Sequence, residues 1–297
     1  SYGIQAYCCH PLMSHDKVIG TLSFGTRSRT TFCDDDVTLM KAVADPRMIS
    51  GVHNYCDRWC ERCRFITRCA VGVMELEDRK EDPKDPDMNS PEFWDKLHGV
   101  FADTFEMVRE WAKKNGVDVD APMPEEYWIE EEKKDKHARN HICARASLRY
   151  MEMARKWLDG SSKDFEDKAD GLMKTISMGT PGRNPEKEAL EIKDAVDVII
   201  WYHTFIHVKL MRAVQQIFEE EPEILEDFPK DYDGSAKIAM ISIDNSVEAW
   251  GTLLRHFPDK EDEILGILAL LQKLRKRTEQ EFPNAWSFKR PGFDDEE

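Results

Sequence analysis

The stretch NPEKEALEIKDAVDVIIWYHTFIHVKLMRAVQQIFEE, residues 184–220, is the longest apolar helix that the sequence predicts. Val196, Ile199 and Leu210 recur at helical spacing and therefore lie on one face, which they share with His203 and His207. A helix with a face of this kind is typical of a bundle, where neighbouring helices cover its apolar side. We expect this face to point inward.

Five further helices are predicted along the chain. In residues 89–116, Ser90 takes the N-cap position, Pro91 takes the first helical position, and Gly116 ends the helix. Its apolar stripe consists of Phe93, Leu97, Val100, Phe101, Phe105, Val108 and Trp111. The other four helices are expected at residues 124–160, 161–179, 233–257 and 258–282. No strand is predicted after Met48, so the fold class is mainly α, a multi-helix bundle.

The first 46 residues follow a different pattern. Alternating residues from Ile4 onward predict a strand, SHD predicts a turn, and KVIGTLSFGT predicts a second strand, which together make a β-hairpin. Asp34, Asp35 and Asp36 then place negative charge where a helix N-terminus favours it, so a helix is expected to follow. A hairpin plus one helix buries too little surface to be stable alone.

Three stretches of this region, HPLM, KVIGTLSFGT and TTFCDDDVTLMKAVAD, resemble the last two core strands and the closing helix of a GAF domain. The resemblance implies a truncated α/β fragment of a small-ligand sensing module used in bacterial signalling. The earlier strands and most of the pocket wall are absent, so it implies no ligand site. The pattern breaks at ADPRM, which leaves open whether the part from Met48 onward began as a separate protein joined to a GAF remnant.

These patterns divide the chain into three segments. Residues 1–47 form the truncated GAF-like segment, residues 48–88 a cysteine-rich segment and an acidic linker, and residues 89–297 the helical bundle. The prolines and dense charge of LEDRKEDPKDPDMNSP predict the linker.

The net charge of −16 lies in the helical part, because residues 1–47 are balanced and the part from Glu75 onward carries about −18. A surface this acidic repels phosphate backbones, which argues against a nucleic-acid partner. No run of ~18 apolar residues is present to span a membrane, and no signal peptide is recognisable at Ser1. We expect a cytoplasmic protein with reduced cysteines, and a protein partner or a small ligand both remain open. The oligomeric state is not readable.

The cysteine-rich segment, YCDRWCERCRFITRC at residues 55–69, contains four of the eight cysteines. Their spacing is C-x3-C-x2-C-x5-C, and thiolate quartets this close together bind zinc or an iron-sulfur cluster. The four interleaved arginines would offset the negative charge of such a site. The sequence therefore predicts a metal site whose ligands are Cys56, Cys60, Cys63 and Cys69.

A second interpretation stays open for the same residues. On an intact helix, Cys56, Cys60 and Cys63 would form one stripe, as free cysteines packed in a core often do. Cys56 and Cys63 would then stand ~10 Å apart, too far for one zinc ion. The metal hypothesis therefore requires a break in the helix. The first three cysteines also have the spacing of radical SAM enzymes, but Arg62 replaces the usual aromatic and no β/α barrel follows.

A separate site is conceivable in the bundle. Three pairs at i, i+4 spacing would each present both members on one face. They are His203 with His207, His137 with His141, and Asp244 with Glu248. Thr204 replaces the glutamate of H-E-x-x-H, and no two Glu-x-x-His motifs occur, so a zinc protease and a ferritin-like di-iron site are disfavoured.

Three functions remain. The first is a metal- or iron-sulfur-binding helical protein with a sensory or redox role in bacterial signalling. The second is a helical metalloenzyme that uses the histidines and carboxylates of the bundle. The third is a helical protein-interaction module without a metal.

Overall fold

Eight α-helices and one β-hairpin make up the part of the chain that the computed structural model describes, which is residues 6–14, 17–26, 47–81, 90–119, 121–122, 124–179, 184–218 and 230–294. The mainly α-helical fold class is confirmed. The chain divides into two compact units. The first comprises residues 1–50 and 60–131, and the second comprises residues 51–59 and 132–297. The three-segment division stays a prediction.

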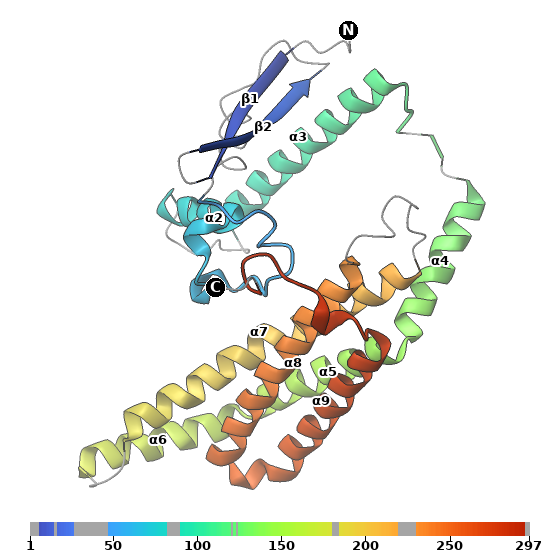
Figure 1. Cartoon of the computed structure of the whole chain (residues 1–297). Coiled ribbons are helices and arrows are strands. Elements are labelled where there is room, and N and C mark those ends of the chain that lie inside the picture. Colours follow the sequence, from blue (N-terminus) through green and yellow to red (C-terminus); the bar gives the residue numbers. More distant parts are fainter. Residues whose placement is uncertain are drawn as a thin grey trace. The chain divides into compact units, whose positions relative to one another are not determined.

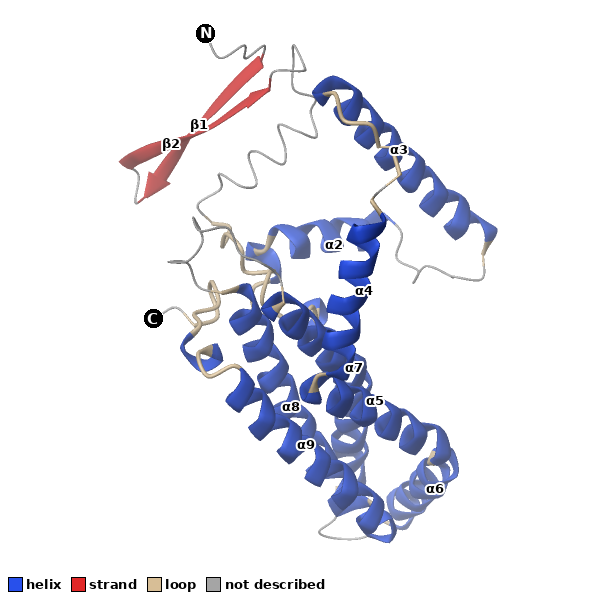
Figure 2. Cartoon of the chain, turned by 90° about the vertical axis from the view of Figure 1, so that its right-hand side faces the viewer, coloured by secondary structure: helices blue, strands red, loops and turns tan. Residues whose placement is uncertain are grey.

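The second unit is built on four long helices, α5 (Ile142–Gly160), α7 (Pro185–Ile217), α8 (Asp231–His256) and α9 (Glu261–Glu281). Each packs against two of the others, in the closed order α5, α7, α8, α9, and the α7–α8 contact is the most extensive (Figures 1 and 2). A further helix, α6 (Ser162–Met178), lies against α7. This is a four-helix bundle with one added helix.

Helix α7 supplies the centre of the apolar core, as its periodicity predicts. Ile199 and Leu210 are fully buried, whereas His203 and His207 are half-buried. On the facing helices, the Trp250 indole N–H donates to the Tyr150 hydroxyl at 3.2 Å inside the core. Both of these aromatic side chains are fully buried, so this hydrogen bond removes the cost of burying their polar atoms.

The prediction of a single helix at residues 124–160 is wrong, because the helix is interrupted at His141. Helix α4 spans Glu125–Asn140, and α5 begins at Ile142. His141 has an extended backbone, and its imidazole Nδ1 accepts a hydrogen bond from the Cys143 amide at 3.3 Å. His141 is thus the N-cap of α5, a role that the helical pattern of its neighbours hides.

The described residues of the first unit include a hairpin, two complete helices and the first part of α4. Strands β1 (Ala6–Ser14) and β2 (Lys17–Thr26) pair antiparallel, with an irregularity between Leu12 and Met13. The helix expected from Asp34 lies outside the described residues. Helix α2 (Ala70–Glu81) extends into a stretch for which the sequence predicted a linker.

Helix α3 (Pro91–Asn115) has the termini that the sequence predicts. The Ser90 side chain accepts a hydrogen bond from the Phe93 amide at 3.2 Å, and Pro91 occupies the first turn. Gly116 ends the helix in the left-handed conformation, with φ of 70°. These contacts satisfy backbone groups that a helix end leaves unpaired.

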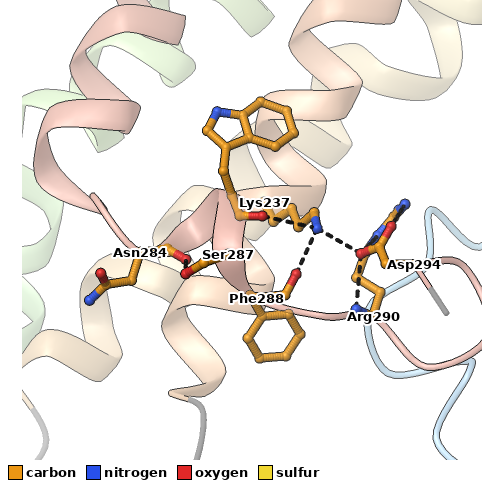
Figure 3. A network of polar contacts seen from close by, with 7 residues as sticks. Lys237, Asn284, Ser287, Phe288, Arg290 and Asp294 are labelled. Carbon is orange, nitrogen blue, oxygen red and sulfur yellow. Dashed lines mark hydrogen bonds and ion pairs between the residues drawn. The ribbon is translucent and has the colours of Figure 1, made fainter. Parts of the chain in front are cut away.

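The C-terminal segment after α9 is held to α8 by a buried lysine (Figure 3). The Lys237 ammonium donates to the Phe288 carbonyl at 2.6 Å and to the Asp294 carboxylate at 2.7 Å. Asp294 also accepts two hydrogen bonds from the Arg290 guanidinium, at 3.1 and 2.9 Å. A buried ammonium group needs hydrogen-bond partners, and the C-terminal segment supplies them to Lys237.

No helix within the described ranges has the length and apolar character needed to cross a membrane.

Replacement of two glycines of α8 by alanine is expected to change the free energy of unfolding in opposite directions. A Cβ at Gly234 would lie 2.5 Å from Tyr55 Cδ1 and 2.7 Å from Phe288 Cζ, whereas one at Gly251 would meet no atom within 4 Å. We expect Gly234→Ala to lower the free energy of unfolding by about 1–3 kcal/mol through overpacking. Gly251→Ala, the matched control, should raise it by about 0.5–1 kcal/mol. Urea denaturation measures both, and equal changes would contradict the packing described.

The Lys237–Asp294 contact predicts a pH dependence. Burial raises the pKa of Asp294, but hydrogen bonds from Arg290 and Lys237 outweigh it and hold the pKa well below its usual range. A carboxyl with a depressed pKa stabilises the fold above its unfolded pKa of about 3.9, and the contribution is lost as the pH falls further. Asp294→Asn should therefore be less stable than wild type at pH 7. In thermal unfolding between pH 7 and pH 2, the difference should shrink below about pH 4, and a constant difference would refute it.

Candidate functional site

The backbone of the cysteine-rich segment is not an α-helix. Residues 57–59 have no regular structure, and Arg58 adopts a positive φ of 60°. Two short 3-10 turns follow, Cys60–Arg62 and Ile66–Arg68. The intact helix that would have aligned Cys56, Cys60 and Cys63 in one stripe is therefore absent from this segment.

The first residues of the segment belong to the second unit and are attached to α7. The Tyr202 hydroxyl donates to the Asp57 carboxylate at 2.7 Å, and the Trp201 indole N–H donates to the Asp57 carbonyl at 3.0 Å. The Trp59 ring stacks on the Trp201 ring with their centroids 5.0 Å apart. One turn of α7 thus holds both Asp57 and Trp59.

Tyr55 is attached to α8 in a similar way. Its hydroxyl donates to the Asp231 carboxylate at 2.8 Å, and its ring meets the Phe288 ring edge-on at 4.5 Å. Burial, then the hydrogen bond to Asp231, raises the pKa of Tyr55 to about 12, so the hydroxyl stays a donor. Cys56 lies between two attached residues, Tyr55 and Asp57, and its thiol donates to the His53 carbonyl at 3.5 Å.

The other three cysteines of the segment belong to the first unit. Cys60 and Cys63 are half-buried, and Cys69 is buried just before α2 begins. The Cys63 sulfur accepts a hydrogen bond from the Phe65 amide, and the Cys69 sulfur accepts one from the Gly72 amide, both at 3.4 Å. Main-chain donors directed at sulfur tune the sulfur ligands of metal clusters.

Cys143 provides a contrast within the same chain. It is fully buried in the bundle core, where the Thr278 hydroxyl lies 3.9 Å from its sulfur. Burial raises the pKa of Cys143 to about 11, which keeps the thiol protonated and inert. Cys56, Cys60 and Cys63 are each more exposed than this packing cysteine.

Within the described ranges, no three or more His, Cys, Asp or Glu side chains are grouped so that they could hold one metal ion. The four-cysteine metal site therefore stays a prediction. What the backbone does provide is a set of thiols on short turns, next to main-chain donors.

The histidines of the bundle have separate partners. His207 Nδ1 lies 2.9 Å from the Ser147 hydroxyl, and burial lowers the pKa of His207. His203 Nδ1 lies 2.8 Å from the Ile200 carbonyl of its own helix. His141 Nε2 lies 3.4 Å from the Glu281 carboxylate.

The remaining members of the predicted bundle site are exposed. His137 has its ring centroid 5.8 Å from that of Phe218. Asp244 pairs with Arg275 at 2.9 Å, and Glu248 lies on the same exposed side of α8. The structure thus does not gather these six side chains around a common point.

The sequence analysis missed the role of Asp57. Tyr55, Asp57 and Trp59 occupy every second position, and each contacts a residue of the helical bundle or its C-terminal segment. This alternation, interleaved with Cys56 and Arg58, is a signal that was present in the sequence.

One family model matches the chain. Residues 1–46 match the GAF domain family, which confirms the resemblance of this segment to part of a GAF domain. The match ends before the cysteine-rich segment. No curated protein and no solved structure matches the chain.

The Tyr202–Asp57 hydrogen bond predicts a stability effect. Tyr202→Phe leaves the half-buried Asp57 carboxylate without this donor, so we expect the free energy of unfolding to fall by about 1–2 kcal/mol. The chain near Arg58 should also become more susceptible to trypsin, because Asp57 is less firmly held. Tyr127→Phe, at an exposed tyrosine, is the control and should change neither quantity. Urea denaturation and timed proteolysis measure the effects, and unchanged cleavage in Tyr202→Phe would count against the attachment.

Proposed function

We propose that the cysteine-rich segment binds a metal ion or an iron-sulfur cluster, and that the protein has a sensory or redox role in bacterial signalling. The ligands are Cys60, Cys63 and Cys69, with Cys56 as the fourth by sequence spacing. The observation that carries the proposal is the broken backbone from residue 57 to residue 63. A broken helix is the condition under which closely spaced cysteines can converge, whereas an intact one would keep their sulfurs apart.

The exposure of two of the proposed ligands, Cys60 and Cys63, supports this proposal over core packing, and the third, Cys69, is buried. Cysteines that serve only as small apolar residues are buried, as Cys143 is. Cys60 and Cys63 are half-buried instead, and the Cys63 sulfur already accepts a backbone hydrogen bond. Both features suit a ligand that must be reached by a metal and then held in one orientation.

The local charge also suits thiolate ligands. The segment contains four arginines and two acidic residues, which gives 4 − 2 = +2 in a chain whose net charge is −16. A divalent ion held by four thiolates carries a net charge of about −2. The arginines therefore balance a site that the acidic remainder of the chain would disfavour.

The thiols have to close around the metal as it binds. Coupling of this kind is usual for small metal sites, where ligand deprotonation and local folding accompany binding. Cys56 lies between Tyr55 and Asp57. If Cys56 moves, the hydrogen bonds of these two residues to Asp231 and Tyr202 are disturbed. The GAF segment at residues 1–46 supports a sensory role and a place in signalling.

Metal analysis of the full chain tests the proposal. We expect protein purified without oxygen to contain about one zinc ion, or iron and acid-labile sulfide with a brown colour, per chain. The double variant Cys60→Ser/Cys63→Ser should lose it. Cys143→Ala, the matched control in the core, should keep the metal and lose only stability.

Two results would reject the proposal. One is wild-type protein that contains neither metal and takes up neither iron with sulfide nor zinc when these are supplied. The other is equal metal content in the wild type and the double variant.

A further inference from the structure

Residues 285–294, here called the strap, form a short segment that two helices hold against the bundle. On α8, the Lys237 ammonium donates to the Phe288 carbonyl at 2.6 Å, and Phe288 is only 7% exposed (Figure 3). On α9, the Glu279 carboxylate accepts a hydrogen bond from the Trp286 indole N–H at 3.2 Å. The strap is therefore fixed at more than one point along its length.

The strap also covers the turn that leads into the cysteine-rich segment, residues 51–55. At one end of this turn, the Phe288 ring meets the Tyr55 ring edge-on, with the centroids 4.5 Å apart. At the other end, a Cβ built on Gly51 would lie 3.6 Å from Cγ of Pro291, so the Pro291 ring packs beside Gly51. The turn and the strap belong to the same compact unit. The strap thus contacts both ends of the turn.

Cys56 directly follows this turn and depends on it for its hydrogen bond. Its thiol donates to the carbonyl of His53, which lies inside the turn, at 3.5 Å. On the other side of Cys56, the Asp57 carboxylate accepts a hydrogen bond from Tyr202 of α7. Cys56 is therefore half-buried between a residue attached to a core helix and a turn covered by the strap.

These two supports differ in how easily they can open. Helix α7 supplies the centre of the core, so Tyr202 is released only when the bundle unfolds. The strap has a single 3-10 turn, Ala285–Ser287, as its regular structure. Segments with few buried contacts open locally at a lower free energy than core helices. The strap is therefore expected to separate from the bundle before α7 does.

We propose that the strap is a closure over the turn at residues 51–55 and that its opening exposes the Cys56 thiol. When the strap opens, Tyr55 loses the Phe288 ring and keeps its hydrogen bond to Asp231 of α8. The turn is then free to move, and the contact between the Cys56 thiol and the His53 carbonyl is no longer enforced. The closure controls the access of thiol-reactive molecules to Cys56, whether or not the segment binds a metal.

Alkylation of the full chain with iodoacetamide, in the presence of a chelator, tests the closure. Trypsin releases residues 48–58, in which Cys56 is the only cysteine, so mass spectrometry can follow this thiol by itself. Phe288→Ala removes the ring that covers Tyr55. We expect Cys56 to react about 5- to 30-fold faster in this variant than in the wild type, because the open form becomes more populated.

Cys143 reports on the bundle in the same samples. It is fully buried and is the only cysteine in residues 140–145, which trypsin also releases. Its slow reaction should be unchanged in Phe288→Ala, because opening of the strap leaves the core packed. Unfolding of the whole bundle would instead expose Cys143 and Cys56 together.

Two further variants make the test specific. Asp294→Asn weakens the contact of the strap with Lys237 and leaves the Phe288 side chain in place, so Cys56 should again react faster, by a smaller factor. Lys168→Met is the matched control, because it removes an ion pair with Glu188 in the same unit but outside the strap. It should leave the reaction of Cys56 at the wild-type rate.

Three results would overturn the proposal. One is an equal rate for Cys56 in the wild type and both strap variants. Another is a parallel rise for Cys56 and Cys143, which would mean that the bundle loosens as a whole. The third is an equal acceleration of Cys56 in Lys168→Met. Because the chelator is present throughout, none of these results depends on the proposed metal site.

Discussion

The packing of α7 against α8 is the contact on which the second unit depends. Ile199, Ile206 and Leu210 of α7 are fully buried, and Trp250 of α8 is buried on the facing side. The first residues of the second unit and its C-terminal segment are both attached to this pair of helices. Asp57 is held by α7 through Tyr202, and the C-terminal segment is held by α8 through Lys237. Without the α7–α8 contact, neither attachment has a surface to form on.

The attachment of Asp57 shows that the cysteine-rich segment also contains residues that contact the helical bundle. The same short sequence contains residues of two kinds, cysteines suited to bind a metal and alternating residues that bind the bundle. Asp57 and Trp59 have their partners in Tyr202 and Trp201, neighbours on a single turn of α7. Cys56 therefore lies between two residues, Tyr55 and Asp57, that are hydrogen-bonded to helices of the bundle.

Some helix ends followed from local rules that the sequence makes visible. Ser90 and Gly116 bound α3 through contacts within one turn, so the sequence predicted them. The break at His141 escaped prediction because an imidazole cap is unusual and the helical pattern continues on both sides. Helix α2 escaped it because its charged sequence resembles that of a linker, as the acidic residues of Ala70–Glu81 illustrate. In the candidate site, the cysteine spacing was readable and the backbone path was not.

The sequence by itself determined the mainly helical class, the inward face of α7, the GAF segment and the cysteine spacing, because each depends on residues close together in the chain. Only the tertiary structure decided that the cysteine-rich segment is not a helix and that Asp57 pairs with Tyr202. Those two residues are 145 positions apart. No periodicity connects them, since their contact exists only after α7 has packed and offered its surface.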